Sequence, residues 1–238
     1  LRYRWRITLA AALNGGGRIQ EAGDLLADEL RHAEALEPSQ VGEIKHRLAY
    51  LALSRNDAEG AWEPATEGLQ LASRLGDIEL QARCANVVAY VHHSRGHDEE
   101  ALRTLQSVQR TAEANHLTSV QRSLLTNLVK MHVMLRQPDE AHTRMQQALR
   151  LFSTDPDAAT HSRLQSRLTE VLLLRGDIGA ALASSEESIR LMESVGGPAG
   201  TFWPWYQRGR LLWQIGANVA AVDVYRQLPH SPAWSEFV

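Results

Sequence analysis

The sequence predicts an all-α fold, a right-handed α–α superhelix built from six two-helix repeats. The first observation is a short pattern, a turn followed by acidic or small residues and then an alanine, which recurs six times in the 238 residues. The second is its regular period, because successive alanine positions differ by 39 and then four times by 40. A fixed period in this range is typical of stacked supersecondary units. A small side chain there lets the two helices of a repeat approach closely. The six alanines are Ala22, Ala61, Ala101, Ala141, Ala181 and Ala221.

The third observation is the helical spacing of apolar residues inside each repeat. In the third repeat a first helix is expected over 78–95, where Cys84, Val88 and Val91 are four and three residues apart. That spacing places them on one face of a helix. Gly96 follows, and glycine commonly ends a helix. A second helix is expected to fill the rest of the repeat.

The whole chain is therefore interpreted as one repeat array, 1–238. Inter-repeat turns are expected at 155–157 and 196–198, where proline and glycine break helices. Residues 229–238 are expected to form a loop and the start of another helix. The chain does not begin with Met, so we expect it to be a fragment of a longer protein with attached domains. The repeat units are approximately 1–37, 38–76, 77–116, 117–156, 157–196 and 197–238.

Composition excludes several classes of function. The formal net charge of −3 argues against a surface dominated by contacts to nucleic-acid phosphates. The single cysteine, Cys84, excludes an intrachain disulfide and is compatible with a reducing compartment. No apolar run approaches the roughly 18 residues of a membrane span, and no signal peptide is visible. We therefore expect a cytoplasmic protein that contacts neither membrane nor nucleic acid through this segment.

The sixth repeat contains, in this order, Trp205, Gly209, Leu212, Gly216, Ala221 and Tyr225. This order resembles the tetratricopeptide repeat. The other repeats keep the alanine but lack the tryptophan and the final proline. The repeat is longer here than the common tetratricopeptide repeat, which has a period of about 34 residues. Longer units of this kind are similar to those of kinesin light chains and to the superhelical sensor region of MalT-type bacterial transcription activators of the LuxR class.

The resemblance implies a non-catalytic domain that senses an effector or a partner for a bacterial regulator. In that family a nucleotide-binding switch domain precedes the array and a helix-turn-helix follows it. The alternative is a constitutive scaffold that binds an extended peptide or helix in its concave groove. The ligand is expected to be a protein, a peptide or a small-molecule effector. No arrangement typical of an enzyme stands out in the sequence, and we expect no cofactor.

The resemblance also implies that the first helix of each repeat, here called the A helix, lines the concave face. Three rows of residues, each advancing by one repeat at a time, then lie three and four residues apart on one stripe of the A helices. We name them after their first members. The 43 row is Glu43, Arg83, Ser123, Arg163 and Trp203; the 46 row is His46, Asn86, Thr126, Ser166 and Tyr206; the 50 row is Tyr50, Tyr90, Lys130, Glu170 and Arg210.

These rows combine hydroxyl, amide and aromatic groups with a few charges, which favours a binding groove. An ordinary solvated inner face would also be polar, and that interpretation stays open. Arginine and amide groups suit a carboxylate, a phosphate or a peptide backbone. The cluster of Trp203, Tyr206, Arg210 and Trp213 suits a sugar or an aromatic ring, and packing between helices is the alternative for its tryptophans. The candidate binding residues are His46, Tyr50, Arg83, Asn86, Tyr90, Thr126, Lys130, Arg163, Ser166, Glu170, Trp203, Tyr206 and Arg210.

Other chemistry-bearing residues receive structural interpretations. His92 and His132 share one repeat position, but no carboxylate recurs at matching positions, so we expect packed histidines and no metal site. Cys84 lies on a core stripe and is expected to be inert. The N-terminal arginines at positions 2, 4 and 6 alternate with aromatic residues, and we expect them to face an adjoining domain.

Overall fold

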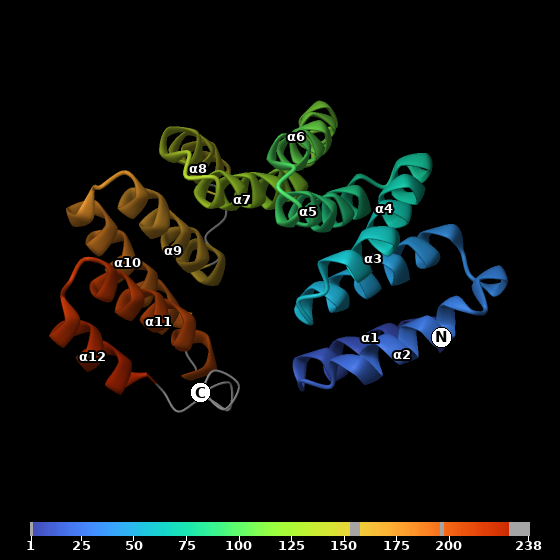
Figure 1. Cartoon of the computed structure of the whole chain (residues 1–238), viewed down its shortest axis with the longest axis horizontal. Coiled ribbons are helices and arrows are strands. Elements are labelled where there is room, and N and C mark those ends of the chain that lie inside the picture. Colours follow the sequence, from blue (N-terminus) through green and yellow to red (C-terminus); the bar gives the residue numbers. More distant parts are fainter. Residues whose placement is uncertain (1, 153–157, 196–197, 229–238) are drawn as a thin grey trace. The chain divides into compact units, whose positions relative to one another are not determined.

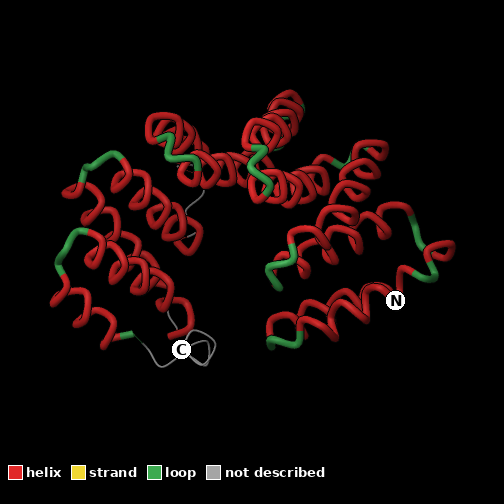
Figure 2. The backbone as a smooth tube through the Cα atoms, viewed as in Figure 1, coloured by secondary structure: helices red, strands yellow, loops and turns green. Residues whose placement is uncertain are grey.

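The computed structural model describes residues 2–152, 158–195 and 198–228. These residues form helices and turns, and no strand occurs among them (Figures 1 and 2). The predicted all-α class is confirmed. The turns expected at 155–157 and 196–197, and the tail 229–238, lie outside the described residues. The elements are α1 (Arg2–Gly15), α2 (Ile19–Leu30), a 3₁₀ helix (Ala33–Ala35), α3 (Pro38–Ser54), α4 (Ala58–Leu75), α5 (Ile78–Ser94), α6 (Asp98–Ala114), α7 (Thr118–Met134), α8 (Pro138–Phe152), α9 (Ala158–Leu174), α10 (Ile178–Val195), α11 (Pro198–Gln214) and α12 (Asn218–Gln227).

The helices follow one another in pairs, as the repeat pattern predicts. The odd-numbered helices are the A helices, and α4, for example, packs against α3 as α10 packs against α9. The predicted role of the recurring alanine is confirmed, because all six alanines are at most 2% exposed. A methyl group is what fits where the second helix of a repeat crosses the first.

The turn within each repeat has the same backbone conformation in all six. The residue five positions before the recurring alanine has a positive φ, the left-handed conformation that glycine adopts without steric cost. Glycine occupies four of these turns. Asn56 and Arg136 occupy the other two, with φ of 59° and 53°. The four glycines are Gly17 (76°), Gly96 (76°), Gly176 (80°) and Gly216 (81°).

The chain divides into two compact units, residues 1–127 and 128–238, and the division falls within α7. Below, unit 1 and unit 2 are these two ranges. The arrangement of all six repeats as one array stays a prediction. None of the helices in the described ranges has the length and apolar character needed to cross a bilayer.

Each unit has its own core. In unit 1 Leu26 and Ile44 are buried between successive repeats, and Cys84 is buried as predicted. Burial raises the pKa of the Cys84 thiol to about 12, which disfavours the reactive thiolate form. In unit 2 a Cβ added to Gly209 would lie 2.5 Å from the ring of Tyr225. The glycine and the aromatic residue of the sixth repeat are therefore one close contact between α11 and α12.

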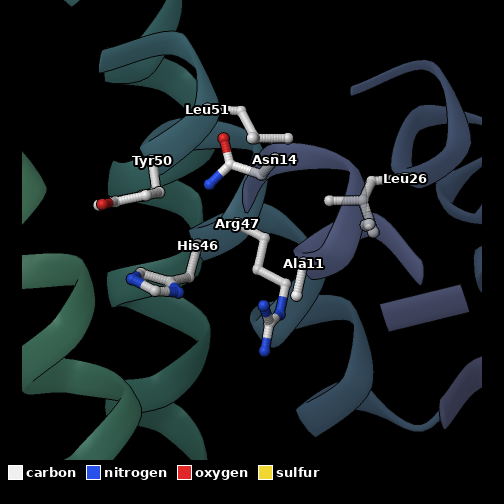
Figure 3. Close-up of a pocket in the computed structure, with 8 residues that line it drawn as sticks. Ala11, Asn14, Leu26, His46, Arg47, Tyr50 and Leu51 are labelled. Carbon is white, nitrogen blue, oxygen red and sulfur yellow. The ribbon is translucent and has the colours of Figure 1, made fainter. Parts of the chain in front are cut away.

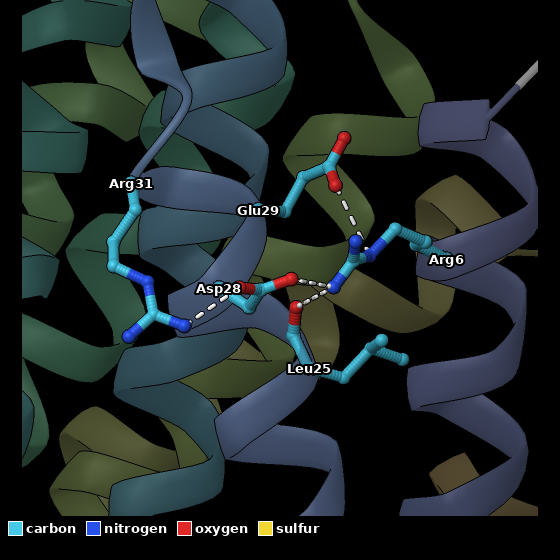
Figure 4. Close-up of polar contacts among 5 residues, drawn as sticks. All are labelled: Arg6, Leu25, Asp28, Glu29 and Arg31. Atoms are coloured by element: carbon cyan, nitrogen blue, oxygen red, sulfur yellow. Dashed lines mark hydrogen bonds and ion pairs between the residues drawn. The ribbon is translucent and has the colours of Figure 1, made fainter.

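Arg6 corrects an expectation about the N-terminal arginines. Its guanidinium turns inward and joins α1 to α2 (Figure 4). Nη2 donates to the Leu25 carbonyl at 3.2 Å and to Asp28 Oδ2 at 2.5 Å, and Nε lies 3.0 Å from Glu29 Oε2. Arg31 and Arg6 together lower the pKa of Asp28 to about 2. Arg6 thus stabilises the first helix pair, whereas Arg4 and Trp5 are exposed.

Candidate functional site

The predicted rows bring charged groups together across neighbouring A helices of unit 1. Glu43 on α3 and Arg83 on α5 are successive members of one row, and their Oε2 and Nη1 atoms lie 2.7 Å apart. Arg47, one turn further along α3, contacts the same carboxylate at 2.8 Å. Glu43 is therefore held between two guanidinium groups, one from its own helix and one from the next repeat.

A cavity of about 240 Å³ lies beside this network, on the A-helix face of unit 1 (Figure 3). Residues of α1 and α3 form most of its wall, and α2 contributes Leu26. Apolar side chains and a few polar groups share the lining, as in most small-molecule sites. Tyr50 is 52% exposed. The lining residues are Ala10, Ala11, Asn14, Leu26, His46, Arg47, Tyr50 and Leu51.

His46 is the most strongly perturbed base of this cavity. Burial lowers its pKa to about 4, and the charges of Arg83 and Arg47 act in the same direction against the opposing effect of Glu43. The ring is therefore neutral at physiological pH, and it offers the cavity a neutral hydrogen-bonding edge. Its Nδ1 atom is buried and has no hydrogen-bond partner among the residues that the structure describes.

Unit 2 contains a second glutamate that contacts two arginines. Glu170 on α9 and Arg210 on α11 are again successive members of one row, with Oε1 and Nη2 at 3.0 Å. Arg167 Nη1 lies 2.8 Å from Oε2 of the same carboxylate. The second glutamate is thus also held between an arginine of its own helix and one of the next repeat.

A larger cavity, of about 600 Å³, lies beside Glu170. Its wall comes from the C-terminal ends of three A helices and from the turn after α7. It brings together Lys130, Glu170 and Arg210, the three successive members of the 50 row that belong to unit 2. The lining residues are Lys130, Val133, Met134, Arg136, Arg167, Glu170, Leu173, Leu174, Arg210 and Gln214.

The charges around this cavity perturb Lys130. Its side chain is exposed at the rim, yet loss of hydration lowers its pKa. The guanidinium of Arg167 lowers the pKa further, and the carboxylate of Glu170 opposes both effects. The lysine therefore lies where positive charge is already concentrated.

Ser166 is a correction to the predicted groove. It is buried, and its hydroxyl lies 2.8 Å from that of Ser188 on α10. Ser162 of α9 donates to the Ser188 carbonyl at 2.7 Å. The Ser166 hydroxyl therefore has its hydrogen-bond partner inside the α9–α10 pair. It is not directed into the predicted groove.

The remaining candidates reach the surface to different degrees. Asn86 and Arg163 are exposed, and Tyr90 is half-buried. Thr126 is also half-buried and donates its hydroxyl to the Arg122 carbonyl, 2.9 Å away on its own helix. Thr126 is therefore a weaker candidate for ligand contact than Asn86.

Three aromatic residues of the sixth repeat, Trp203, Tyr206 and Tyr225, lie together. Trp203 and Tyr206 are stacked, with ring centroids 5.5 Å apart and 29° between the planes. Tyr206 also contacts the ring of Tyr225 on α12 at 6.2 Å. Trp203 is still 46% exposed, so one ring of the cluster is accessible while the others pack between helices.

Comparison with solved structures identifies the fold. No model of a known protein family matches the sequence, and no curated protein does. A Rap protein complexed with competence and sporulation factor superposes with a TM-score of 0.72 at 13% identity, over 95% of this chain and 73% of that one. This chain has a tetratricopeptide-like fold.

Two further solved structures share the tetratricopeptide-like fold. NprR in complex with its cognate peptide NprX gives a TM-score of 0.65 at 10% identity, over 93% of this chain and 64% of that one. A signal transduction ATPase with numerous domains from Pyrococcus horikoshii, which has a tetratricopeptide repeat sensor, gives 0.69 at 15% identity, over 95% of this chain and 36% of that one. At these identities the likeness concerns the fold.

Three arginines around the tetratricopeptide-like rows were missed by sequence reasoning. Arg47 and Arg167 occupy one register position, three repeats apart, immediately after the 46 row. Arg136 occupies the turn position where most repeats have glycine. Both features, the shared register position of Arg47 and Arg167 and the arginine in the turn, are visible when the repeats are aligned. The three rows miss them because none of the three arginines belongs to a row. In the described part of the chain, no group of three or more His, Cys, Asp or Glu side chains is arranged to hold a metal ion.

Proposed function

We propose that this chain is a non-catalytic binding domain whose A helices hold a protein or peptide segment, and that it is the sensing array of a bacterial transcription regulator of the MalT type. One observation carries the proposal. Row members from successive repeats are in contact in both units, Glu43 with Arg83 and Glu170 with Arg210. Within each unit, two members of one row are therefore in contact across the boundary between repeats.

Accessible side chains on this surface suit a peptide. Tyr50 and Trp203 expose aromatic rings, and Asn86 exposes an amide that both donates and accepts hydrogen bonds. Aromatic residues and arginine are frequent among the residues that dominate binding energy. NprR with its cognate peptide is a protein of similar fold, which supports the choice of a peptide as ligand.

The position of the ion pairs supports a sensing role. The pair between Glu43 and Arg83 joins two successive A helices, so a ligand that engages either group also changes the contact between repeats. A ligand shifts a conformational equilibrium by its difference in affinity for the two states. The ATPase with a tetratricopeptide repeat sensor, similar in fold, supports this role.

The peptide surface is tested by selecting binders from a displayed library of random peptides. The variant Tyr50→Ala/Asn86→Ala removes two exposed groups of unit 1 and is expected to reduce the affinity of the selected peptides at least about tenfold. Trp5→Ala removes an exposed aromatic ring outside the three rows and is the matched control. Equal losses in both variants would contradict the proposal.

The regulatory role is tested separately, by reading the gene on both sides of this segment. A nucleotide-binding switch domain before the array and a helix-turn-helix after it support the MalT-type regulator. An array joined to neither would contradict that role and favour a constitutive scaffold, because the binding surface does not depend on the flanking domains.

A further inference from the structure

The unit 2 cavity concentrates positive charge. Four cationic side chains line it, and Glu170 is the one carboxylate among its lining residues, so the side chains contribute a net charge of +3 at neutral pH. The unit 1 cavity, in contrast, has a single arginine and no carboxylate among its lining residues. The four cationic residues of the unit 2 cavity are Lys130, Arg136, Arg167 and Arg210.

The partial negative charges at the C-terminal ends of three helices offset only part of this positive charge. The final residues of α7, α9 and α11 are Met134, Leu174 and Gln214, and all three line the cavity. A helix C-terminus is equivalent to roughly −0.5 of a unit charge. Three such ends offset about half of the side-chain charge and leave an excess of about 1.5 positive charges. The cations therefore exceed what is needed to neutralise the helix ends.

Arg136 adds an independent observation. It has a φ of 53° in a turn where four of the other five repeats have glycine. The left-handed conformation costs an ordinary residue about 1 kcal/mol relative to glycine. The chain thus carries an arginine where glycine would be more stable, and the side chain of that arginine lines the cavity. Residues held in costly backbone conformations are frequent at binding sites.

Glu170 positions two of the four cations. Arg167 contacts it through Nη1 and Arg210 through Nη2. A guanidinium has five N–H donors, and each of these ion pairs involves one nitrogen, so further N–H groups are directed from a fixed position. The carboxylate therefore holds two arginines from neighbouring repeats in place for a second, incoming anion.

The size and remaining wall of the cavity define the rest of the ligand. At about 600 Å³ the cavity lies within the range of small-molecule sites. Val133, Met134, Leu173 and Leu174 give it an apolar side. We propose that the unit 2 cavity binds a small organic phosphate, with the phosphate dianion between Arg136, Arg167 and Arg210 and the organic body against the apolar wall. A phosphate monoester carries about −1.5 to −2 charges at neutral pH, which matches the excess positive charge.

This site shares Glu170 and Arg210 with the proposed surface but takes a ligand of different chemistry, so it is tested with its own probe. Isothermal titration calorimetry of the whole chain with phenyl phosphate is expected to show saturable binding at millimolar concentration. In Arg167→Gln/Arg210→Gln the affinity is expected to fall at least about tenfold, because two charge-assisted contacts are lost. Arg190→Gln is the matched control, since Arg190 is an exposed arginine of unit 2 that pairs with Glu187 on its own helix.

Arg136→Gly separates binding from folding. Because glycine suits the turn, this variant is expected to unfold at a higher temperature and yet to bind phenyl phosphate several-fold more weakly. Phenyl sulfate, a monoanion of the same shape, is expected to bind more weakly than phenyl phosphate, and so is inorganic phosphate, which lacks the organic body. No saturable binding, equal affinity of the arginine variants and the control, or phenyl phosphate binding no more tightly than either of the other two probes would overturn the proposal.

Discussion

The two cavities are built on the same scaffold and offer different chemistry. Each lies on the A-helix face, beside a glutamate held between two arginines, one of which belongs to the next repeat. The unit 1 cavity is small and has a neutral histidine in its wall, whereas the unit 2 cavity is larger and strongly cationic. The repeat fixes the backbone and the close helix contacts, and the residues that line the two cavities differ.

The largest expected difference between the two units is in how their stability depends on acid, because unit 1 contains His46. The folded-state pKa of about 4 lies below the value of 6.5 for an unperturbed histidine. As pH falls from 6.5 to 4, the unfolded chain takes up this proton before the folded chain does. The free energy of unfolding should therefore fall by as much as about 3 kcal/mol in this window.

His46→Gln tests this assignment through urea unfolding at several pH values. The variant is expected to lose the part of the pH dependence between 6.5 and 4 that comes from His46. The part from His92, whose pKa burial also lowers, and the loss at lower pH from groups such as Asp28 persist. An unchanged pH profile would show that His46 is not the group responsible. Unit 2 has Ser166 at the equivalent position, so it should contribute no comparable step.

Enlarging the recurring alanine should destabilise the two units equally, because both use the same helix pair. Ala101 in unit 1 and Ala141 in unit 2 are both completely buried. Ala101→Leu and Ala141→Leu are each expected to lower the free energy of unfolding by about 1–3 kcal/mol through overpacking. Urea denaturation measures both, with Ala220→Leu on the exposed face of α12 as the control. A tolerated leucine at either position would break the equivalence of the repeats.

The smallest effect concerns the two turns that lack glycine. Asn56→Gly in unit 1 and Arg136→Gly in unit 2 both relieve a positive φ. Asparagine tolerates this conformation better than arginine. The gain in free energy of unfolding is therefore expected to be about 1 kcal/mol for Arg136→Gly and a few tenths for Asn56→Gly. Thermal unfolding tests the order, and a larger gain at Asn56 would contradict the strain assigned to Arg136.

The sequence predicts the scaffold well because the repeat multiplies every signal six times. One buried alanine is weak evidence, but six at a fixed period specify the helix pairs and their turns. The site is less predictable, because polarity alone does not show where a side chain points. Ser166 and Asn86 belong to one row, yet the serine finds partners on α10 and is buried while the asparagine is exposed. Arg136 shows the opposite case, because a residue in the turn is not expected to line a cavity of the A helices, and yet Arg136 does.

The difference in binding chemistry between the units is tested most directly by an NMR titration of the whole chain with phenyl phosphate, read residue by residue. We predict that amide shifts gather around the unit 2 cavity, at Arg136, Glu170 and Arg210, and that Tyr50 and Asn86 of unit 1 stay unchanged. Shifts of equal size in both units, or shifts spread over the surface, would contradict the claim that the row residues give the two units separate binding chemistry.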